Sequence, residues 1–179
     1  RDVAWLERGG LKLVIKGYPE LPGVEYYTSD LIRRLTGYAP YSDLFNINGM
    51  PVLVMEYVEG PMLEEKGVSI DQLDKEHLGD RLIAEMLINP EDGKPDNYIV
   101  QSLPNQSQRI VSIDNDHMFV PSVAKTPTGK THIQVKSVLF TLDQMMDLIP
   151  EELIRRWQSM ILTDPLAFLE KWIDGIEKV

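Results

Sequence analysis

The sequence predicts an α+β fold in which a small antiparallel sheet with one helix is followed by a mainly helical second part. Two apolar, β-branched runs at 11–16 and 51–58 flank a stretch with helical spacing. Beyond residue 60 the apolar residues recur mainly at helical intervals, apart from two strand-like runs at 97–101 and 109–113. This order favours one compact core, or two small lobes that share a cleft.

The first predicted elements are a strand, a turn and a helix. Residues 11–16 read Leu-Lys-Leu-Val-Ile-Lys, an alternating run that predicts a strand ending at Lys16. A helix is predicted over about 24–35, with Gly37 as its C-terminal cap. The run at 51–58 then predicts a second, largely buried strand, which the Glu-Gly-Pro sequence after it ends.

A helix and a hairpin are predicted in the middle of the chain. The helix has about four turns and must end at Pro90, which cannot continue it. Residues 97–101 and 109–113 predict the two strands of the hairpin, because Pro, Asn and Ser between them favour a turn. The hairpin is expected to bring Asn97 and Asp114 towards one end of the cleft. The apolar stripe of the helix is Leu73, Leu78, Leu82, Ile83, Met86 and Leu87.

The last third is predicted to be a loop followed by helices. Residues 115–136 read as a hydroxyl-rich loop. Thr141 and Gln144 are expected to form a capping box, Pro150 to be a first-turn residue, and Asp164 to open a last helix. The predicted buried stripes are Leu153, Trp157, Met160, Leu166, Leu169, Trp172, Ile173 and Ile176. Both tryptophans are expected in the core, the alternative being a partner surface on these helices.

Composition restricts the kinds of site that the chain can carry. Cysteine is absent, which excludes disulfides and thiolate zinc sites, and there are only three histidines. The formal charge of -10 argues against binding to nucleic acid or anionic lipid, although Lys125, Lys130 and Lys136 form a local basic patch. We found no apolar stretch long enough to cross a bilayer or to act as a signal peptide. A cytoplasmic protein with an oxygen-bound metal is therefore expected.

Two short motifs suggest the chemistry. Residues 90–100 place Asp92 five residues before Asn97, which opens an apolar run, and residues 109–116 end a β-like run on Asp114. Upstream, a strand ends on a lysine, an acidic residue opens the next helix, and the later strand ends at a hinge-like break. With its motifs in this order, the chain resembles the protein-kinase-like superfamily. It looks most like the atypical branches, which include HipA-like kinases, actin-fragmin kinase and phosphoinositide kinases.

The resemblance implies an ATP- and magnesium-dependent phosphotransferase that acts on a hydroxyl of a protein, lipid or small molecule. It assigns catalysis to Asp92, which orients the acceptor hydroxyl, and to Lys94 near the transferred phosphate. Asn97 and Asp114 match the metal ligands, since magnesium prefers oxygen ligands. Residues 1–60 correspond to a partial N-lobe and residues 61–179 to the C-lobe. The residues expected at the nucleotide are Lys16, its acidic partner Glu25 (with Asp30 as the rival), Met55, Glu56 and Tyr57.

Three departures from the kinase pattern open an alternative. Pro90 and Glu91 stand where kinases usually have His and Arg, and the glycine that follows the metal-binding aspartate is replaced, giving Asp114-Asn115-Asp116. Only residues 1–10 precede the lysine strand, so the glycine-rich hairpin over the phosphates is expected to be missing, and the chain to be a fragment. The alternative function is a pseudokinase-like binding module with weak or absent catalysis.

Each assigned residue also has a simpler interpretation. Lys16 can be a solvated lysine at a strand end, Asp92 a turn former, and Asp114 a cap at the end of a strand. Asp116 and His117 can be taken for a metal pair, but neighbouring pairs of this kind are usually surface residues. Gly129-Lys130-Thr131 resembles the end of a P-loop, but without the required first glycine and strand it is better explained as a turn.

Overall fold

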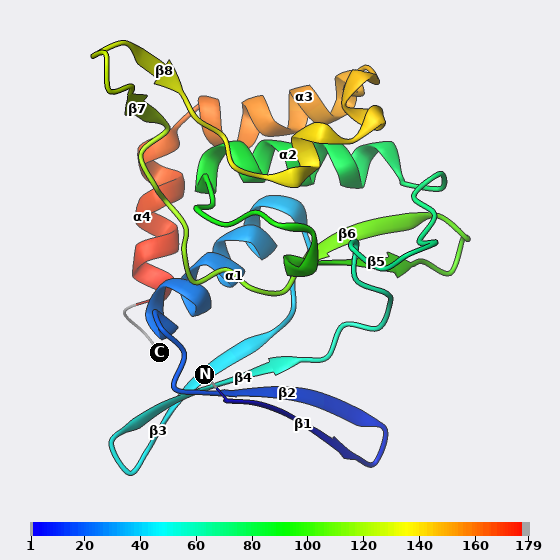
Figure 1. The fold of residues 1–179 in the computed structure, drawn as a ribbon, viewed down its shortest axis with the longest axis vertical. Coiled ribbons are helices and arrows are strands. Elements are labelled where there is room, and N and C mark those ends of the chain that lie inside the picture. The colour runs from blue at the N-terminus through cyan, green and yellow to red at the C-terminus, as the bar shows by residue number, and fades with distance from the viewer. Residues whose placement is uncertain (1, 177–179) are drawn as a thin grey trace.

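A computed structural model of the chain shows a mixed α/β fold, with small antiparallel sheets and four α-helices among the residues that it describes (Figure 1). The structure describes residues 2–176, without the side chains of residues 161, 162 and 176. The predicted α+β class is therefore confirmed at this level. Within the described range, none of the helices has the length and apolar character needed to cross a membrane.

A four-stranded antiparallel sheet forms the N-terminal part. Its strands are β1 (Asp2–Arg8), β2 (Leu11–Gly17), β3 (Ser42–Ile47) and β4 (Met50–Glu56), and their order in the sheet is β1-β2-β4-β3. The two predicted strands are β2 and β4. Strand β1 was not predicted, and it pairs with β2, the strand that carries Lys16, along seven residues. Gly9 and Gly10 make the tight turn with φ of 59° and 83°, values that glycine adopts without strain.

The strand register decides which side chains share a face of this sheet. Lys16 lies opposite Leu53 in β4, and Val14 lies opposite both Trp5 in β1 and Met55 in β4. Directly opposed residues point to the same side, so these five side chains lie on one face. Leu53, Met55 and Lys16 are buried on that face, whereas Trp5 on the edge strand is exposed.

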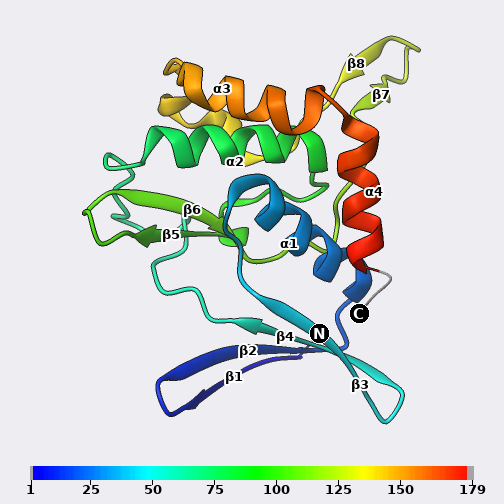
Figure 2. The ribbon, with the colours of Figure 1, turned by 180° about the vertical axis from the view of Figure 1, so that it is seen from behind.

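Two helices cover the inner face of the sheet in successive layers. Helix α1 (Pro22–Thr36) lies between the sheet and α2 (Lys75–Ile88), as Figure 1 and the reverse view in Figure 2 both show. Gly37 caps α1 in the left-handed conformation, as predicted, and Asp74 caps α2 by accepting hydrogen bonds from two backbone amides. The core between them consists of Leu31, Ile32, Leu35, Ala84 and Ile88, with Leu153 and Trp157 from a later helix.

The predicted hairpin is present as β5 (Tyr98–Ser102) and β6 (Gln108–Ser112), and a 3₁₀ turn (Pro95–Asn97) leads into it. A fully buried polar network ties it to α2. Arg81 donates to Glu85 and, at 3.1 Å, to Ser112, and the Tyr98 hydroxyl lies 3.1 Å from Glu85 and 3.0 Å from Ser137. Burial and, to a smaller extent, the negative charge of Glu85 raise the pKa of Tyr98, so its hydroxyl stays neutral.

The segment predicted as a loop contains a second hairpin. Strands β7 (Val123–Lys125) and β8 (Thr131–Ile133) pair over three residues each and project from the body in both ribbon views. Gly129, with φ of 80°, makes the turn between them. Three-residue strands are too short to produce an alternation that can be recognised in the sequence, which explains the wrong prediction.

The C-terminal segment forms two 3₁₀ turns (Val138–Thr141 and Asp143–Met146), α3 (Glu151–Trp157), a π-helical turn (Gln158–Leu162) and α4 (Pro165–Ile176). The predicted capping box is wrong, because Thr141 ends the first 3₁₀ turn and its hydroxyl donates to the Val138 carbonyl at 2.7 Å. Pro150 lies just before α3 rather than in its first turn. Asp164 does cap α4, accepting from the Ala167 amide at 2.9 Å.

The predicted buried stripes of this segment are correct only in part. Leu153 and Trp157 are buried, and Met160 and Trp172 are half-buried against the same core. Helix α4 contacts the body along one side only, beside α1 (Figures 1 and 2), where Gly175 approaches Arg34. Leu166, Leu169 and Ile173 are therefore exposed, contrary to the prediction, and the Ile176 side chain lies outside the described residues.

Candidate functional site

A cavity of about 650 Å³ lies between the inner face of the sheet and the hairpin β5–β6. Its size is in the range of pockets that hold small ligands. Strands β1, β2 and β4 supply one wall, and residues 57–65, the turn before β5 and the end of β6 supply the other. Seven of the predicted site residues line it: Lys16, Met55, Glu56, Tyr57, Lys94, Asn97 and Asp114.

The other two predicted residues, Glu25 and Asp92, contact residues of the cavity wall. Glu25 forms an ion pair with Lys16, and Asp92 forms one with Lys94, with 3.1 Å between Nζ and Oδ2. All nine predicted residues therefore belong to one region, although they are spread from Lys16 to Asp114 in the sequence. Asp30, the rival partner of Lys16, instead pairs with Arg34 on the exposed side of α1 at 2.7 Å.

Lys16 is a buried lysine whose ammonium contacts three acceptors. It pairs with the fully buried Glu25, donates to the Ile113 carbonyl at 2.9 Å, and lies 3.3 Å from Asp114 Oδ1. The sheet positions it, because it is the last inward-facing residue of β2. The first turn of α1 positions Glu25 opposite. A buried charge is tolerated only when it is paired, and these contacts provide Lys16 with acceptors from three separate segments.

Asn97 and Asp114 lie together because the strands that adjoin them are paired. The Ile113 amide donates to the Asn97 carbonyl at 3.0 Å, which extends the β5–β6 ladder by one step. The Asn97 side-chain nitrogen donates to the Asp92 carbonyl at 2.5 Å. With its nitrogen used in this way, the amide oxygen of Asn97 is the atom that can ligate a cation.

The loop that carries Asp92 and Lys94 is held by its neighbours through Gly93. The Gly93 amide donates to the Lys136 carbonyl at 3.1 Å, and the Gly93 carbonyl accepts from Val138 at 2.7 Å. A Cβ at this position would lie 2.6 Å from the Lys136 oxygen, so no larger residue fits without moving the backbone. The hydrogen bond and charge of Asp92 raise the pKa of Lys94, which keeps that side chain cationic.

The segment at the end of β4 forms the far end of the cavity. The Glu56 amide donates to the Tyr41 carbonyl at 2.7 Å, and the Tyr57 amide donates to the Lys12 carbonyl at 3.1 Å. These bonds hold the segment to the sheet. The side chain of Met55 is buried against the wall, and that of Tyr57 is partly exposed, with the Lys12 ammonium 5.5 Å from its ring.

Asp116 lies beside two of the predicted site residues, which the sequence interpretation did not expect. Carboxylate oxygens of Glu25, Asp114 and Asp116 all lie within 4.8 Å of one another, and Asp116 is buried. The sequence interpretation regarded Asp116 and His117 as ordinary surface residues. For Asp116 this is wrong, because the chain after β6 turns back under α1, where Asn115 donates to Ser29 at 3.2 Å. The available signal was the alternation Asp114-Asn115-Asp116 directly after a buried strand.

His117 joins this region to the loop before α1. Its ring nitrogens lie 3.4 Å from Glu20, 3.6 Å from Glu91 and 3.9 Å from Asp116. Partial burial lowers the pKa of His117, but the surrounding carboxylates, with Asp116 first, raise it more, so the net shift is upward. The imidazole therefore carries more positive charge near neutral pH than an ordinary histidine does.

The donor set at this end of the cavity suits a hard divalent cation. It consists of carboxylate oxygens from Asp114 and Asp116, grouped with that of Glu25, and the amide oxygen of Asn97 on the cavity wall. Asp116 also forms a second group with Glu20 and His117, in which one donor is an imidazole nitrogen. Asp96 adds a carboxylate to the wall, and its Oδ1 atom is buried without a hydrogen-bond partner. Oxygen ligands of this kind match magnesium better than zinc or copper.

Comparisons with known proteins leave the family open. No protein-family model matches the chain, and no curated protein matches it in sequence. Among solved structures, a Helicobacter pylori proinflammatory kinase, CtkA, is similar with a TM-score of 0.47 and 14% sequence identity. The match covers 65% of this chain and 55% of that one, so this chain spans about half of its length. A likeness this distant carries no argument about activity.

Proposed function

We propose that the chain is an ATP- and magnesium-dependent phosphotransferase of protein-kinase-like type, which transfers the γ-phosphoryl group to a hydroxyl of a protein or a small-molecule or lipid acceptor. One observation supports it above the others. Lys16 is buried, paired with Glu25 and 3.3 Å from Asp114, at the end of a cavity that Asn97 and Lys94 also line. A buried lysine between two acids, facing oxygen ligands for a cation, suits the binding of a nucleoside triphosphate.

In this proposal each residue has a separate role. Glu25 and the Ile113 carbonyl hold the Lys16 ammonium in place, so that it can hydrogen-bond phosphate oxygens. Asp114 and Asn97 would hold Mg²⁺, with Asp116 as a further carboxylate beside them. When bound, Mg²⁺ would neutralise the negative charge that develops on the phosphates.

The acceptor side of the reaction is assigned to the Asp92 loop. The Asp92 carboxylate is 56% exposed, so an acceptor hydroxyl can reach it, and it can orient that hydroxyl by accepting its proton in a hydrogen bond. Lys94 lies between Asp92 and Asp96, 3.1 Å and 3.6 Å away, and lines the cavity. Its positive charge would therefore lie near the phosphoryl group during transfer.

The proposal also assigns the two parts of the chain to the two lobes of a kinase. We propose that residues 1–60 form a partial N-lobe and residues 61–179 a C-lobe, with the cavity between them and Met55, Glu56 and Tyr57 next to the nucleotide. An atypical branch of the superfamily fits best, because Pro90 and Glu91 precede Asp92. The β1–β2 hairpin carries the lysine on its own second strand, a further departure from the usual kinase pattern.

A second candidate function is a nucleotide-binding module without catalysis. The observation that favours it is the position of Asp92, which is paired with Lys94 and lies outside the set of residues that line the cavity. Such a module would bind the nucleotide through Lys16 and Asp114 and leave the phosphates intact.

Thermal unfolding with Mg·ATP tests the binding part of the proposal. Ligand at a hundredfold excess over its Kd stabilises the native state by about 2.7 kcal/mol. For a chain of this size that raises the Tm by roughly 5 to 11 °C. Asp114→Asn should remove most of the magnesium-dependent part of this rise. Asp71→Ala, a change at an exposed loop aspartate that hydrogen-bonds to Ser69 and does not line the cavity, is the control and should keep the rise.

Transfer of labelled γ-phosphoryl from ATP to water or to the chain's own hydroxyls tests the catalytic part. Asp92→Ala should keep the Tm rise with Mg·ATP and lose at least about a hundredfold in the transfer rate. A wild-type chain that binds Mg·ATP but transfers nothing would support the second candidate instead. A wild-type chain whose Tm does not respond to Mg·ATP would contradict both functions.

A further inference from the structure

Trp5 is an unusual residue on the wall of the cavity. Its side chain is 72% exposed, although it lies on the inner face of the sheet. It lines both the main cavity and a smaller one of about 220 Å³, which Glu7, Lys12 and Tyr57 complete. The indole therefore stands between two hollows, and the structure gives it no buried position.

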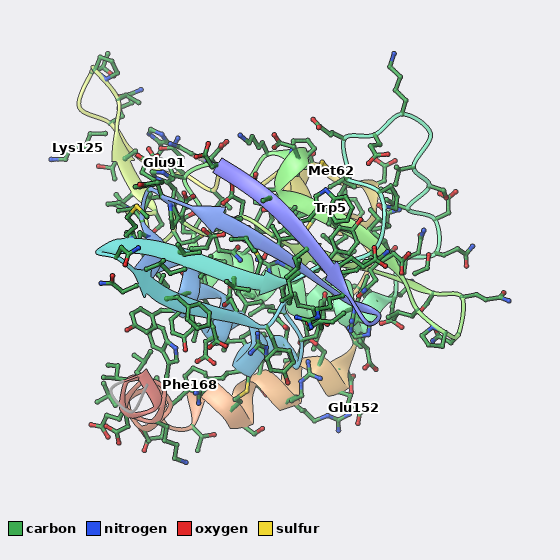
Figure 3. All side chains as sticks on the ribbon, turned by 90° about the horizontal axis from the view of Figure 1, so that it is seen from below. Trp5, Met62, Glu91, Lys125, Glu152 and Phe168 are labelled. Atoms are coloured by element: carbon green, nitrogen blue, oxygen red, sulfur yellow. The ribbon has the colours of Figure 1, made fainter. Side chains whose placement is uncertain are left out.

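The register places Trp5 at the apolar end of the main cavity. Trp5 pairs with Val14, which is two residues before Lys16 on β2, a separation of about 6.6 Å along the strand. Val14 and Met55 are its neighbours on the sheet, and Met62 and Ile99 lie on the opposite wall. Trp5 and Met62 both line the cavity, and both are labelled beside β1 in the view of Figure 3. The charged residues Lys16, Lys94 and Asp114 gather at the other end.

The two ends of the cavity therefore differ in the ligand groups that they can bind. Phosphates belong at the end with the two lysines, and Glu64 and Glu65 on the wall near Met62 would repel them from the other end. What remains at the Trp5 end is a space with one apolar wall on the sheet and another across from it. A flat aromatic ring suits that space better than a phosphate or a sugar alone.

We propose that Trp5 is the residue that stacks on the base of the bound nucleotide and covers it. This proposal rests on the function proposed above. Stacking of a base on an aromatic side chain is tolerant of which base is present but strongest for large rings, and its loss costs roughly 5- to 150-fold in affinity.

The three tryptophans of the chain allow Trp5 to be observed directly. Trp157 is buried, with its indole N–H 2.7 Å from Asp80, and Trp172 is half-buried against the same core. The red-shifted part of the emission should therefore come from Trp5. Saturating Mg·ATP should quench or blue-shift that part, and inorganic tripolyphosphate with Mg²⁺, which has no base, should leave it unchanged.

Affinity measurements on three variants separate stacking from general binding. Trp5→Ala should weaken binding of Mg·ATP roughly 5- to 150-fold and leave binding of magnesium tripolyphosphate unchanged. Trp5→Phe should retain most of the affinity for Mg·ATP, because it keeps a flat ring. Leu6→Ala is the matched control, since Leu6 is the next residue of β1, is also exposed, and points to the opposite face of the sheet. It should change neither affinity.

The outcomes distinguish this inference from the proposed function. If Trp5→Ala binds Mg·ATP as wild type does, or weakens Mg·ATP and tripolyphosphate equally, the stacking role is wrong and the phosphotransferase proposal stands. If the wild-type chain binds neither ligand, the proposed function fails, and the role of Trp5 fails with it. Unfolding curves of the ligand-free variants check that each one is folded.

Discussion

Replacing Glu25 by Gln tests whether the Lys16–Glu25 pair organises the site. The two side chains have nearly the same shape, so the change removes a charge without leaving a cavity. Lys16 then keeps the Ile113 carbonyl at 2.9 Å and Asp114 at 3.3 Å, and it loses its fully buried carboxylate partner. A buried ammonium that has lost its main counter-charge is costly, because the protein interior solvates it poorly.

The size of the effect follows from these contacts. Removing one partner of a buried ion pair typically costs about 3 to 5 kcal/mol of unfolding free energy. The glutamine oxygen still accepts a hydrogen bond from Lys16, and Asp114 remains nearby, so we expect a loss below this range, about 2 to 3 kcal/mol. For a chain of this length, that lowers the Tm by roughly 4 to 12 °C.

Thermal unfolding and urea denaturation of Glu25→Gln measure the effect, with Asp30→Asn as the matched control. Asp30 lies on the same helix but pairs with Arg34 at the surface, where an ion pair contributes less than about 1 kcal/mol. Equal small losses in the two variants would show that the buried pair contributes no more than a surface pair does. The view of Lys16 as a charge held in place by Glu25 would then be wrong.

Two further predictions concern helix packing and pH. Gly79→Ala should lower the unfolding free energy by about 1 to 2 kcal/mol, because the new Cβ would lie 2.3 Å from the Leu153 side chain. This clash outweighs the gain that comes from alanine's higher helix propensity. Denaturation curves of the variant and the wild type measure the difference. His117→Asn should lower stability below pH 6.5 by less than about 1 kcal/mol and matter less near pH 8.5. The pKa of His117 is raised in the folded state, so its stabilising charge is fully present below the unfolded value of 6.5 and is lost as the pH rises through the folded pKa.

Both predictions have a clear contrary result. An increase in stability for Gly79→Ala would mean that Leu153 can move aside and that the higher helix propensity of alanine determines the change in unfolding free energy. A difference between wild type and His117→Asn that grows as the pH rises would mean that the charged imidazole does not stabilise this region. The pKa of His117 can be measured independently by NMR titration, and a value below 6.5 would contradict the upward shift.

Local patterns in the sequence were enough to predict most elements of the first 115 residues. Each element that was predicted has a pattern of apolar residues that extends over at least five residues and is flanked by glycine, proline or polar turn formers. These elements are strands β2 and β4, helices α1 and α2 and the hairpin β5–β6. Patterns of this length reflect burial on one face, so they identify an element before its partners are known. Strand β1, an exposed edge with Trp5 on it, and the three-residue strands β7 and β8 lack that pattern.

The residues of the candidate site also fall into two groups, those that the sequence pattern identified and those that only the folded structure identified. Asp92, Asn97 and Asp114 could be found from their spacing, because each stands in or next to a turn beside an apolar run. The sequence offered Glu25 and Asp30 as rivals for Lys16, and only the rotation of α1 against the sheet makes Glu25 the partner. Asp116 and Trp5, which the structure adds to the candidate site, were not predicted, since the burial of one and the exposure of the other depend on segments distant in sequence.

The local sequence thus determines which segments form strands and helices and which polar residues lie at their ends. The arrangement of those ends is a property of the folded chain. The 650 Å³ cavity exists because β2, β4 and the hairpin β5–β6 meet across more than eighty residues of sequence, and strand register and helix packing decide which side chains face it. Contacts between segments so far apart depend on the packing of the whole chain, and a short sequence window carries no signal of them.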